Sequence, residues 1–145
     1  MQTLKRGLVA ALLLLSPLAQ AEGLQDRLTA FFAEKLAGFS DDVTVTVRTP
    51  PNLYPTCDLP SFNVVGFTKL WGNVNVLARC ANEKRYLQVA VQATGNYVVA
   101  AVPIARGSVL QTNSVTLKRG RLDQLPPRTM LDINQAQDAV SLRDV

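Results

Sequence analysis

Hydrophobic residues recur first at helical spacing. Between residues 24 and 36 they lie three or four positions apart and alternate with charged and polar side chains: Leu24, Leu28, Phe31, Phe32 and Leu36. This spacing predicts an amphipathic helix, and Gly38 is a stop signal for it. An apolar stripe of this kind could bind a membrane or a partner. Such a stripe more often packs on the protein's own sheet, and this is what we expect here.

Strand-like alternation follows the helix. The segment "DDVTVTVR" (41–48) alternates valine with threonine, which is typical of a half-buried strand. After the proline-rich connection "TPPNLYPTCDLP" (49–60), predicted to be extended and irregular, the segments "LWGNVNVLARC" (70–80) and "RYLQVAVQA" (85–93) alternate again. With the turn "ANEK" between them they predict an antiparallel hairpin. We expect "TGN" (94–96) to turn the chain once more before a third strand, "YVVAAVPI" (97–104).

The pattern changes near residue 97. Short strands are predicted at 98–102, 109–110 and 115–118, and "INQAQDAVSLRDV" (133–145) predicts either one or two helical turns or the start of a strand. We therefore expect an α+β fold. An N-terminal helix packs on a small antiparallel sheet over residues 22–97, and a mostly β module follows over residues 98–145.

The first 21 residues are typical of a secretory signal peptide. Lys5 and Arg6 precede an apolar run (8–15), Pro17 follows it, and "AQA" (19–21) is a small-x-small cleavage signature. The apolar run is shorter than the roughly 20 residues that span a bilayer, which disfavours the alternative of a retained membrane anchor. We expect cleavage after Ala21, export, and no stable membrane insertion of the mature chain.

Charge and composition exclude several functions. Without the two basic residues of the signal peptide, thirteen basic and eleven acidic residues remain of the fifteen and eleven in the sequence, a net charge of +2. This near balance predicts no strong attraction to polyanions, and an exported chain without stacking aromatics beside its cations is not expected to bind nucleic acid. The chain has no histidine, the commonest general base and zinc ligand.

No motif predicts catalysis. Gly107 and Gly120 stand thirteen residues apart and flank strand-like sequence, so they do not form a phosphate loop. Neither G-x-S-x-G nor S-x-x-K occurs, and the aspartates show no spacing typical of paired catalytic carboxylates. We expect no enzymatic activity, no cofactor and no metal. An enzyme acting on the cell wall is a remote alternative.

Two cysteines and one basic stretch are the candidate functional residues. An even cysteine count in an exported chain predicts a disulfide between Cys57 and Cys80, worth about 3 kcal/mol for the 22 residues enclosed; two free buried thiols are the alternative. Four cations are candidates for binding a protein partner or a cell-wall polyanion, although such residues are often only solvated: Arg106, Lys118, Arg119 and Arg121. Trp71 and Tyr97 offer stacking faces for a glycan.

The segment "VVAAVPIARGSVLQTNSVTLKRGRLDQLPP" (98–127) resembles the first half of a SAF domain, a small β-clip module. The shared pattern is an apolar strand, then P-I-x-x-G-x-x-L, a polar turn and V-x-L. Together with the signal peptide, the helix, the hairpin segments and "RGRLDQLPP" (119–127), essentially the whole chain resembles the flagellar P-ring formation chaperones of Gram-negative bacteria.

This resemblance implies a non-enzymatic periplasmic factor that helps the P-ring subunit polymerise around the rod in the peptidoglycan layer. It implies no cofactor, and Cys57 and Cys80 match the positions of the family's cysteine pair. The family's β-clip continues beyond "AVSLRDV" (139–145), so we expect residues 98–145 to form only the first part of that module, in a truncated form or completed by strands from elsewhere. The P-ring subunit is the expected partner, and peptidoglycan is a second candidate. The alternative function is that of a periplasmic glycan-binding or peptidoglycan-binding module.

Overall fold

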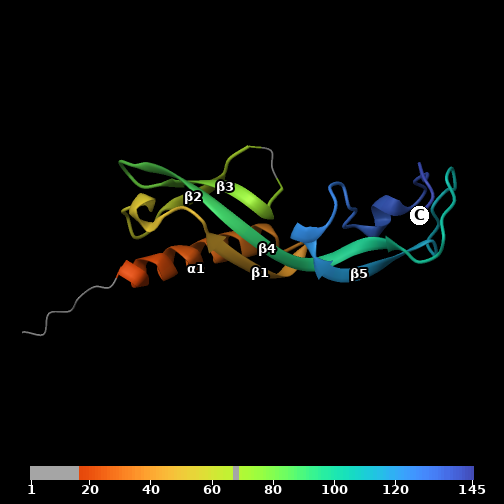
Figure 1. Cartoon of the computed structure of the whole chain (residues 1–145), viewed down its shortest axis with the longest axis horizontal. Helices are drawn as coiled ribbons and strands as arrows, with labels where there is room; N and C mark the ends of the chain where they lie inside the picture. The colour runs from red at the N-terminus through yellow and green to blue at the C-terminus, as the bar shows by residue number, and fades with distance from the viewer. Residues whose placement is uncertain (1–16, 67–68) are drawn as a thin grey trace, which may run out of the picture.

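The computed structural model describes residues 17–66 and 69–145, and most of the predicted signal peptide lies outside them. The described residues form one long helix, α1 (Pro17–Lys35), and five strands: β1 (Ser40–Val47), β2 (Ser61–Val64), β3 (Gly72–Arg79), β4 (Lys84–Ala100) and β5 (Val115–Arg121). Three short 3₁₀ helices lie in the connections: η1 (Pro51–Leu53), η2 (Leu122–Gln124) and η3 (Ile133–Ala136). The predicted α+β fold class is confirmed, with the helix at one end of an elongated, twisted sheet (Figure 1). None of the helices described is both long and apolar enough to cross a membrane.

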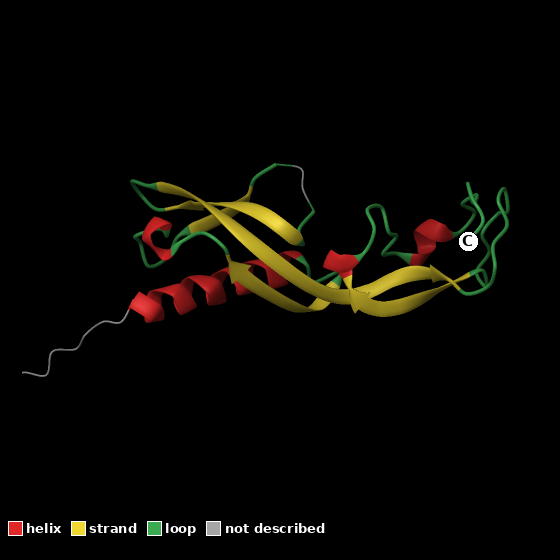
Figure 2. Cartoon of the chain, in the orientation of Figure 1, coloured by secondary structure: helices red, strands yellow, loops and turns green. Residues whose placement is uncertain are grey.

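The sheet is antiparallel and is organised around β4. The strand order is β1-β4-β3-β2, and β5 pairs with β4 as well. Thr94 of β4 is opposite Asp42 of β1 on one side and Arg121 of β5 on the other. Strand β5 therefore continues the edge of β4 that β3 occupies further back, and β4 runs through both halves of the molecule (Figure 2).

The predicted turn at "TGN" is wrong. Strand β4 is 17 residues long and passes straight through residues 94–96. Glycine is needed at position 95 for a different reason: a Cβ there would lie 2.1 Å from the carbonyl oxygen of Phe39. The turn after α1 thus approaches the strand closely, just where β1 has a bulge between Ser40 and Asp42.

The predicted amphipathic helix is confirmed. Leu24, Leu28, Phe32 and Leu36 are buried in one hydrophobic cluster with inward-facing residues of β1, β3 and β4. The inward positions predicted from the alternation of the hairpin are buried as well: Val74, Val76, Ala78, Leu87, Val89 and Val91. Each fully buried Leu, Val or Phe contributes about 1.5–3 kcal/mol relative to an exposed one, so this cluster is the main source of stability.

A second, smaller cluster lies beyond residue 97. It contains the buried residues Ile104, Val115 and Ala136. The predicted strand at 115–118 is confirmed as part of β5, and that at 98–102 is the end of β4. Residues 133–145 combine both alternatives left open by the sequence, since η3 is followed by a bridge between Val140 and Val109. The boundary near residue 97 lies inside β4, and the division into modules 22–97 and 98–145 stays a prediction.

The proline-rich connection is irregular, as predicted, apart from η1. It leads into β2, a strand of four residues that the hydrophobic pattern did not predict. Strand β2 pairs with β3 from Ser61 opposite Arg79 to Val64 opposite Val76. The pairing of β2 with β3 thus fixes the C-terminal end of the proline-rich connection against the sheet.

Candidate functional site

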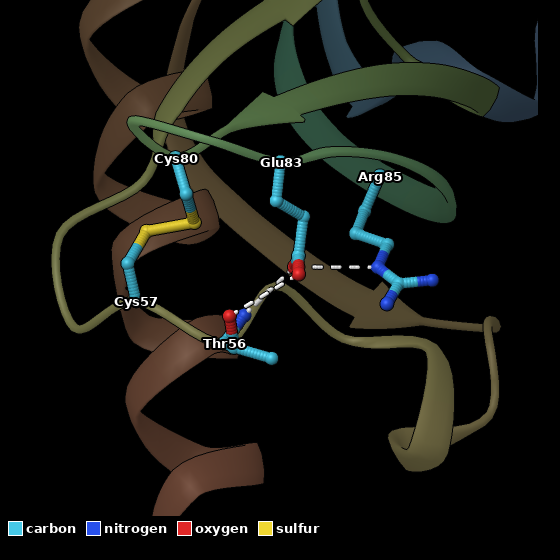
Figure 3. The surroundings of a disulfide bond; sticks show 5 residues. All are labelled: Thr56, Cys57, Cys80, Glu83 and Arg85. Atoms are coloured by element: carbon cyan, nitrogen blue, oxygen red, sulfur yellow. Dashed lines mark hydrogen bonds and ion pairs between the residues drawn. A yellow bond between two sulfur atoms is a disulfide. The ribbon is translucent and has the colours of Figure 1, made fainter.

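The predicted disulfide is confirmed and fixes the proline-rich connection. Cys57 and Cys80, the two cysteines of the sequence, are bonded, with their Cα atoms 5.8 Å apart. The bond joins the middle of the connection to the residue that follows β3 (Figure 3). Because residues 49–60 have little regular structure, this covalent link limits where the segment can lie.

A carboxylate holds the same segment from the neighbouring hairpin. The backbone N–H of Thr56 donates to Oε1 of Glu83 at 3.1 Å, and the Thr56 hydroxyl donates to Oε2 at 3.2 Å. The Arg85 Nε lies 3.3 Å from Oε1 on the other side of the carboxylate (Figure 3). The hydrogen bond from the Thr56 N–H is the main cause that lowers the pKa of Glu83, and the nearby Arg85 lowers it further. Glu83 is therefore an ionised bridge between the connection and β4.

The fixed connection and the first turns of α1 border an open cleft of about 700 Å³. The lining residues are Gly23, Leu24 and Arg27 from the helix, and Pro51, Asn52, Tyr54, Pro55, Thr56, Cys57, Asp58 and Pro60 from the connection. A cleft of this size can hold a small molecule or a few residues of peptide. The described residues contain no group of His, Cys, Asp and Glu arranged to hold a metal ion. The cleft therefore has the size of a binding site, and its described lining is not arranged to hold a metal ion.

Two of the four predicted binding cations are engaged within the chain. Arg119 contacts Asp41 at 2.7 Å, with both side chains well exposed. Arg121 forms a two-point contact with Asp123, and Oδ1 of Asp123 also accepts the Ala93 N–H at 3.2 Å. The Arg121 guanidinium lowers the pKa of Asp123 against the opposing effect of burial. Both arginines thus lie opposite acids on the chain itself.

The other two cations are in different places. Lys118 is exposed on β5 and lies opposite Tyr97. Because Lys118 and Arg119 are consecutive in the strand, their side chains project from opposite faces of the sheet. Arg106 is exposed in the connection between β4 and β5, where its backbone N–H donates to Asp144. The four predicted residues therefore do not form one continuous basic patch.

The sequence did not indicate which strand would carry a free edge; in the structure this strand is β5. Strand β5 pairs with β4 only, so its other edge faces no strand among the described residues. Val98 of β4 donates its N–H to Met130, away from β5, whereas Ala101, three residues further on, donates its N–H to Ser114. Leu117, the partner of Val98, therefore points its own N–H outward to the free edge. Hydrophobic alternation does not show which strand will be an edge.

The two aromatics proposed for glycan stacking are partly buried. Trp71 and Tyr97 both pack against the main hydrophobic cluster. The Tyr97 ring also lies beside Gly120, where its Cε1 atom would be 3.1 Å from a Cβ. Packing therefore accounts for both rings.

No protein-family model matches the chain. It is 67% identical to the flagella basal body P-ring formation protein FlgA of Salmonella typhimurium and 59% identical to that of Escherichia coli, in both cases over all 145 residues. The chain spans 66% of the length of each of these relatives. It also resembles crystal structures of Salmonella FlgA. The closed form has a TM-score of 0.81 at 68% identity, over 84% of this chain and 62% of that one. The open form has a TM-score of 0.79 at 67% identity, over 85% and 58%.

Proposed function

We propose that this chain, which belongs to the family of flagella basal body P-ring formation proteins, is a non-enzymatic periplasmic chaperone for assembly of the flagellar P-ring. The observation that carries the proposal is the identity of 67% and 59% with two such proteins along the whole chain. An assembly factor needs a surface that holds a subunit for a time, and it needs no reaction centre. The disulfide supports an oxidising compartment such as the periplasm.

The free edge of β5 is the surface that best suits this role. An exposed edge strand can add a strand from another protein through backbone hydrogen bonds, which is a common way to recognise extended segments. Such bonds require little of the partner's sequence, so they suit the capture of a subunit before it assembles. We place the contact at residues 115–119, where Thr116, Leu117 and Lys118 are exposed.

Ion pairs within the chain reduce the number of basic residues that are available to a partner. Arg119 and Arg121 already lie against Asp41 and Asp123, so a partner would have to displace these acids to use them. Lys118 is exposed beside the same edge. We assign it the role of steering an acidic segment toward the edge, an effect that acts on the association rate and weakens with salt.

The experiment compares two substitutions at one position. A proline at 117 removes an N–H that points to the free edge, which an edge strand tolerates, whereas alanine removes the side chain and keeps the N–H. We expect the purified chain to bind purified P-ring subunit, Leu117→Ala to bind nearly as well, and Leu117→Pro to lose binding while its thermal unfolding stays cooperative. Equal binding by Leu117→Pro would refute the edge contact. No association of the unaltered chain with folded subunit would refute the chaperone function itself.

A second comparison tests the steering charge. Lys118→Glu should slow association at low ionic strength, and the difference should shrink as salt is added. Lys84→Glu changes an exposed lysine at the far end of the sheet and serves as the matched control. Equal slowing by both variants would mean that only net charge matters.

A further inference from the structure

A tight turn between η2 and η3 holds an arginine in an unfavourable backbone conformation (Figure 2). The Thr129 N–H donates to the carbonyl oxygen of Pro126 at 3.4 Å, and the Thr129 hydroxyl donates to the same oxygen at 2.8 Å. Pro127 is the second residue of this turn, and Arg128, the third, has a φ of 69°. A proline followed by a positive φ matches a type II turn, whose third position favours glycine or asparagine.

No contact among the described residues accounts for an arginine at this position. Arg128 is exposed and forms no ion pair within residues 17–66 and 69–145. Asp138 also has a positive φ, of 62°. Aspartate tolerates this conformation because its short side chain bonds to nearby backbone, whereas arginine gains nothing from it. Because such residues are found where the side chain has a function, Arg128 points to a contact outside the chain.

The turn is held in place from both sides. Leu125 before it and Leu131 after it pack against the main hydrophobic cluster. The carbonyl oxygen of Met130 accepts the Val98 N–H of β4 at 2.9 Å, and two consecutive prolines restrict the backbone of the turn itself. A residue on a fixed backbone loses less conformational freedom on binding than one on a mobile loop. Arg128 is therefore well placed to bind a partner.

The turn lies near the free edge of β5. Met130 is bonded to one side of Val98, and Leu117 lies opposite Val98 on the other side. Because neighbouring strands are about 4.8 Å apart, the backbone of Met130 is about 10 Å from that of Leu117 across the sheet. Met130 is 38% exposed and Leu117 is 44% exposed. An interface covers about 800 Å² on each protein, so a partner that pairs with the free edge also reaches the turn.

We propose that Arg128 binds a carboxylate of the subunit that pairs with the free edge of β5, an inference that rests on the proposed chaperone function. A guanidinium donates from a planar fork to both oxygens of a carboxylate, as Arg121 does to Asp123 within the chain. Backbone hydrogen bonds along the edge require little of the partner's sequence. Arg128 adds a preference for an acidic residue at one place, and it acts after the encounter that Lys118 steers.

The experiment measures the rate at which purified P-ring subunit dissociates from the full chain and its variants. Arg128→Asn removes the charge and introduces a residue that accepts a positive φ, so its melting temperature should be unchanged or about 2 °C higher. Its complex should dissociate about tenfold faster. Arg128→Lys keeps the charge without the fork and should dissociate about threefold faster. Weaker binding by a variant of equal or higher stability cannot result from unfolding.

Two control variants separate this contact from general effects. Arg143→Asn makes the same change at another exposed arginine, and the dissociation rate should be that of the unaltered chain if the net charge is unimportant. Asp138→Asn changes the other described non-glycine residue with a positive φ and should also bind like the unaltered chain.

Several outcomes would overturn the proposal. Equal dissociation rates for Arg128→Asn and Arg143→Asn would do so and would leave the chaperone function standing, because the unaltered chain still binds. A lower melting temperature of Arg128→Asn would give Arg128 a structural role instead. If insoluble peptidoglycan retains the unaltered chain but not Arg128→Asn, and the subunit binds both equally, the turn contacts the cell wall. No association of the unaltered chain with the subunit would refute the proposed function and this inference with it.

Discussion

Gly95 is the position where a single methyl group should matter most. In the structure, an added Cβ would lie 2.1 Å from the carbonyl oxygen of Phe39, 3.2 Å from its carbonyl carbon and 3.3 Å from Cδ1 of Leu122. The first two contacts are with backbone, which cannot rotate away as a side chain can. Gly95→Ala therefore requires a movement of the turn between α1 and β1 or of β4 itself.

The size of the effect follows from this geometry. The Phe39 carbonyl must retreat by about 1 Å or more before the contact becomes tolerable. Overpacking of a well-packed site costs about 1–3 kcal/mol, and a gain of about 0.4–1 kcal/mol from the stiffer unfolded chain offsets part of it. Because the obstacle is backbone, we expect the upper part of that range, a net loss of about 2 kcal/mol. For a domain of this size the melting temperature should fall by about 8 °C.

Circular dichroism can measure this loss during thermal and urea unfolding. Gly38→Ala is the matched control, because it lies one residue before Phe39 and an added Cβ there would have no heavy atom within 4 Å. We expect Gly38→Ala to unfold at or slightly above the temperature of the unaltered chain. If Gly95→Ala and Gly38→Ala unfold at the same temperature, the close approach of Phe39 to β4 is wrong.

Further predictions concern the disulfide, one carboxylate and the two arginine pairs. Replacing both half-cystines by serine should lower the free energy of unfolding in urea by about 3 kcal/mol and expose residues 49–60 to proteolysis; an unchanged midpoint would contradict this. The pKa of Glu83 lies below its ordinary value of 4.5, so its hold on the connection is complete above that pH and is lost as the pH falls through the lower, folded value. The amide signal of Thr56 should accordingly titrate with a midpoint below 4.5, and a midpoint at or above it would contradict the contact. Arg121→Ala should lower the melting temperature more than Arg119→Ala, because it leaves the largely buried carboxylate of Asp123 without its partner, whereas the Arg119 pair is exposed; the reverse order would exclude this account.

The spacing of hydrophobic residues correctly predicted the helix and the strands that pack on each other around the main hydrophobic cluster. The stripe from Leu24 to Leu36 and the alternating residues of β1, β3 and β4 have their spacing because they enclose a single hydrophobic cluster. Strand β2 could not be predicted in this way, since it is four residues long and none of its side chains is fully buried. The second half of the molecule has only three residues in its buried cluster, so the pattern there is weak.

The error at Gly95 has a physical cause that the sequence does not reveal. Glycine is required at tight turns, and it is also required where another backbone comes close to a strand. Thr94 and Asn96 are compatible with a turn, so the local sequence favours that interpretation. The deciding contact comes from Phe39, far away in the chain. Only the packing of α1 on the sheet brings the two segments together.

Contacts between residues far apart in the chain also decide which of the candidate basic residues are available for binding. Arg121 and Asp123 are two residues apart, so their pairing was open to local inspection, whereas Arg119 pairs with Asp41 across 78 residues. Asp41 lies in the β1 bulge next to Gly95. Near this position of β4 the pairing with β1 ends and the pairing with β5 begins. Arg119 therefore connects β5 to β1, and Arg121 holds Asp123, which accepts the N–H of Ala93 in β4; a partner that took either arginine would weaken these contacts. Binding at the outward N–H of Leu117 and at Lys118 leaves both ion pairs in place, which is why the free edge of β5 is the better candidate for contact with the P-ring subunit.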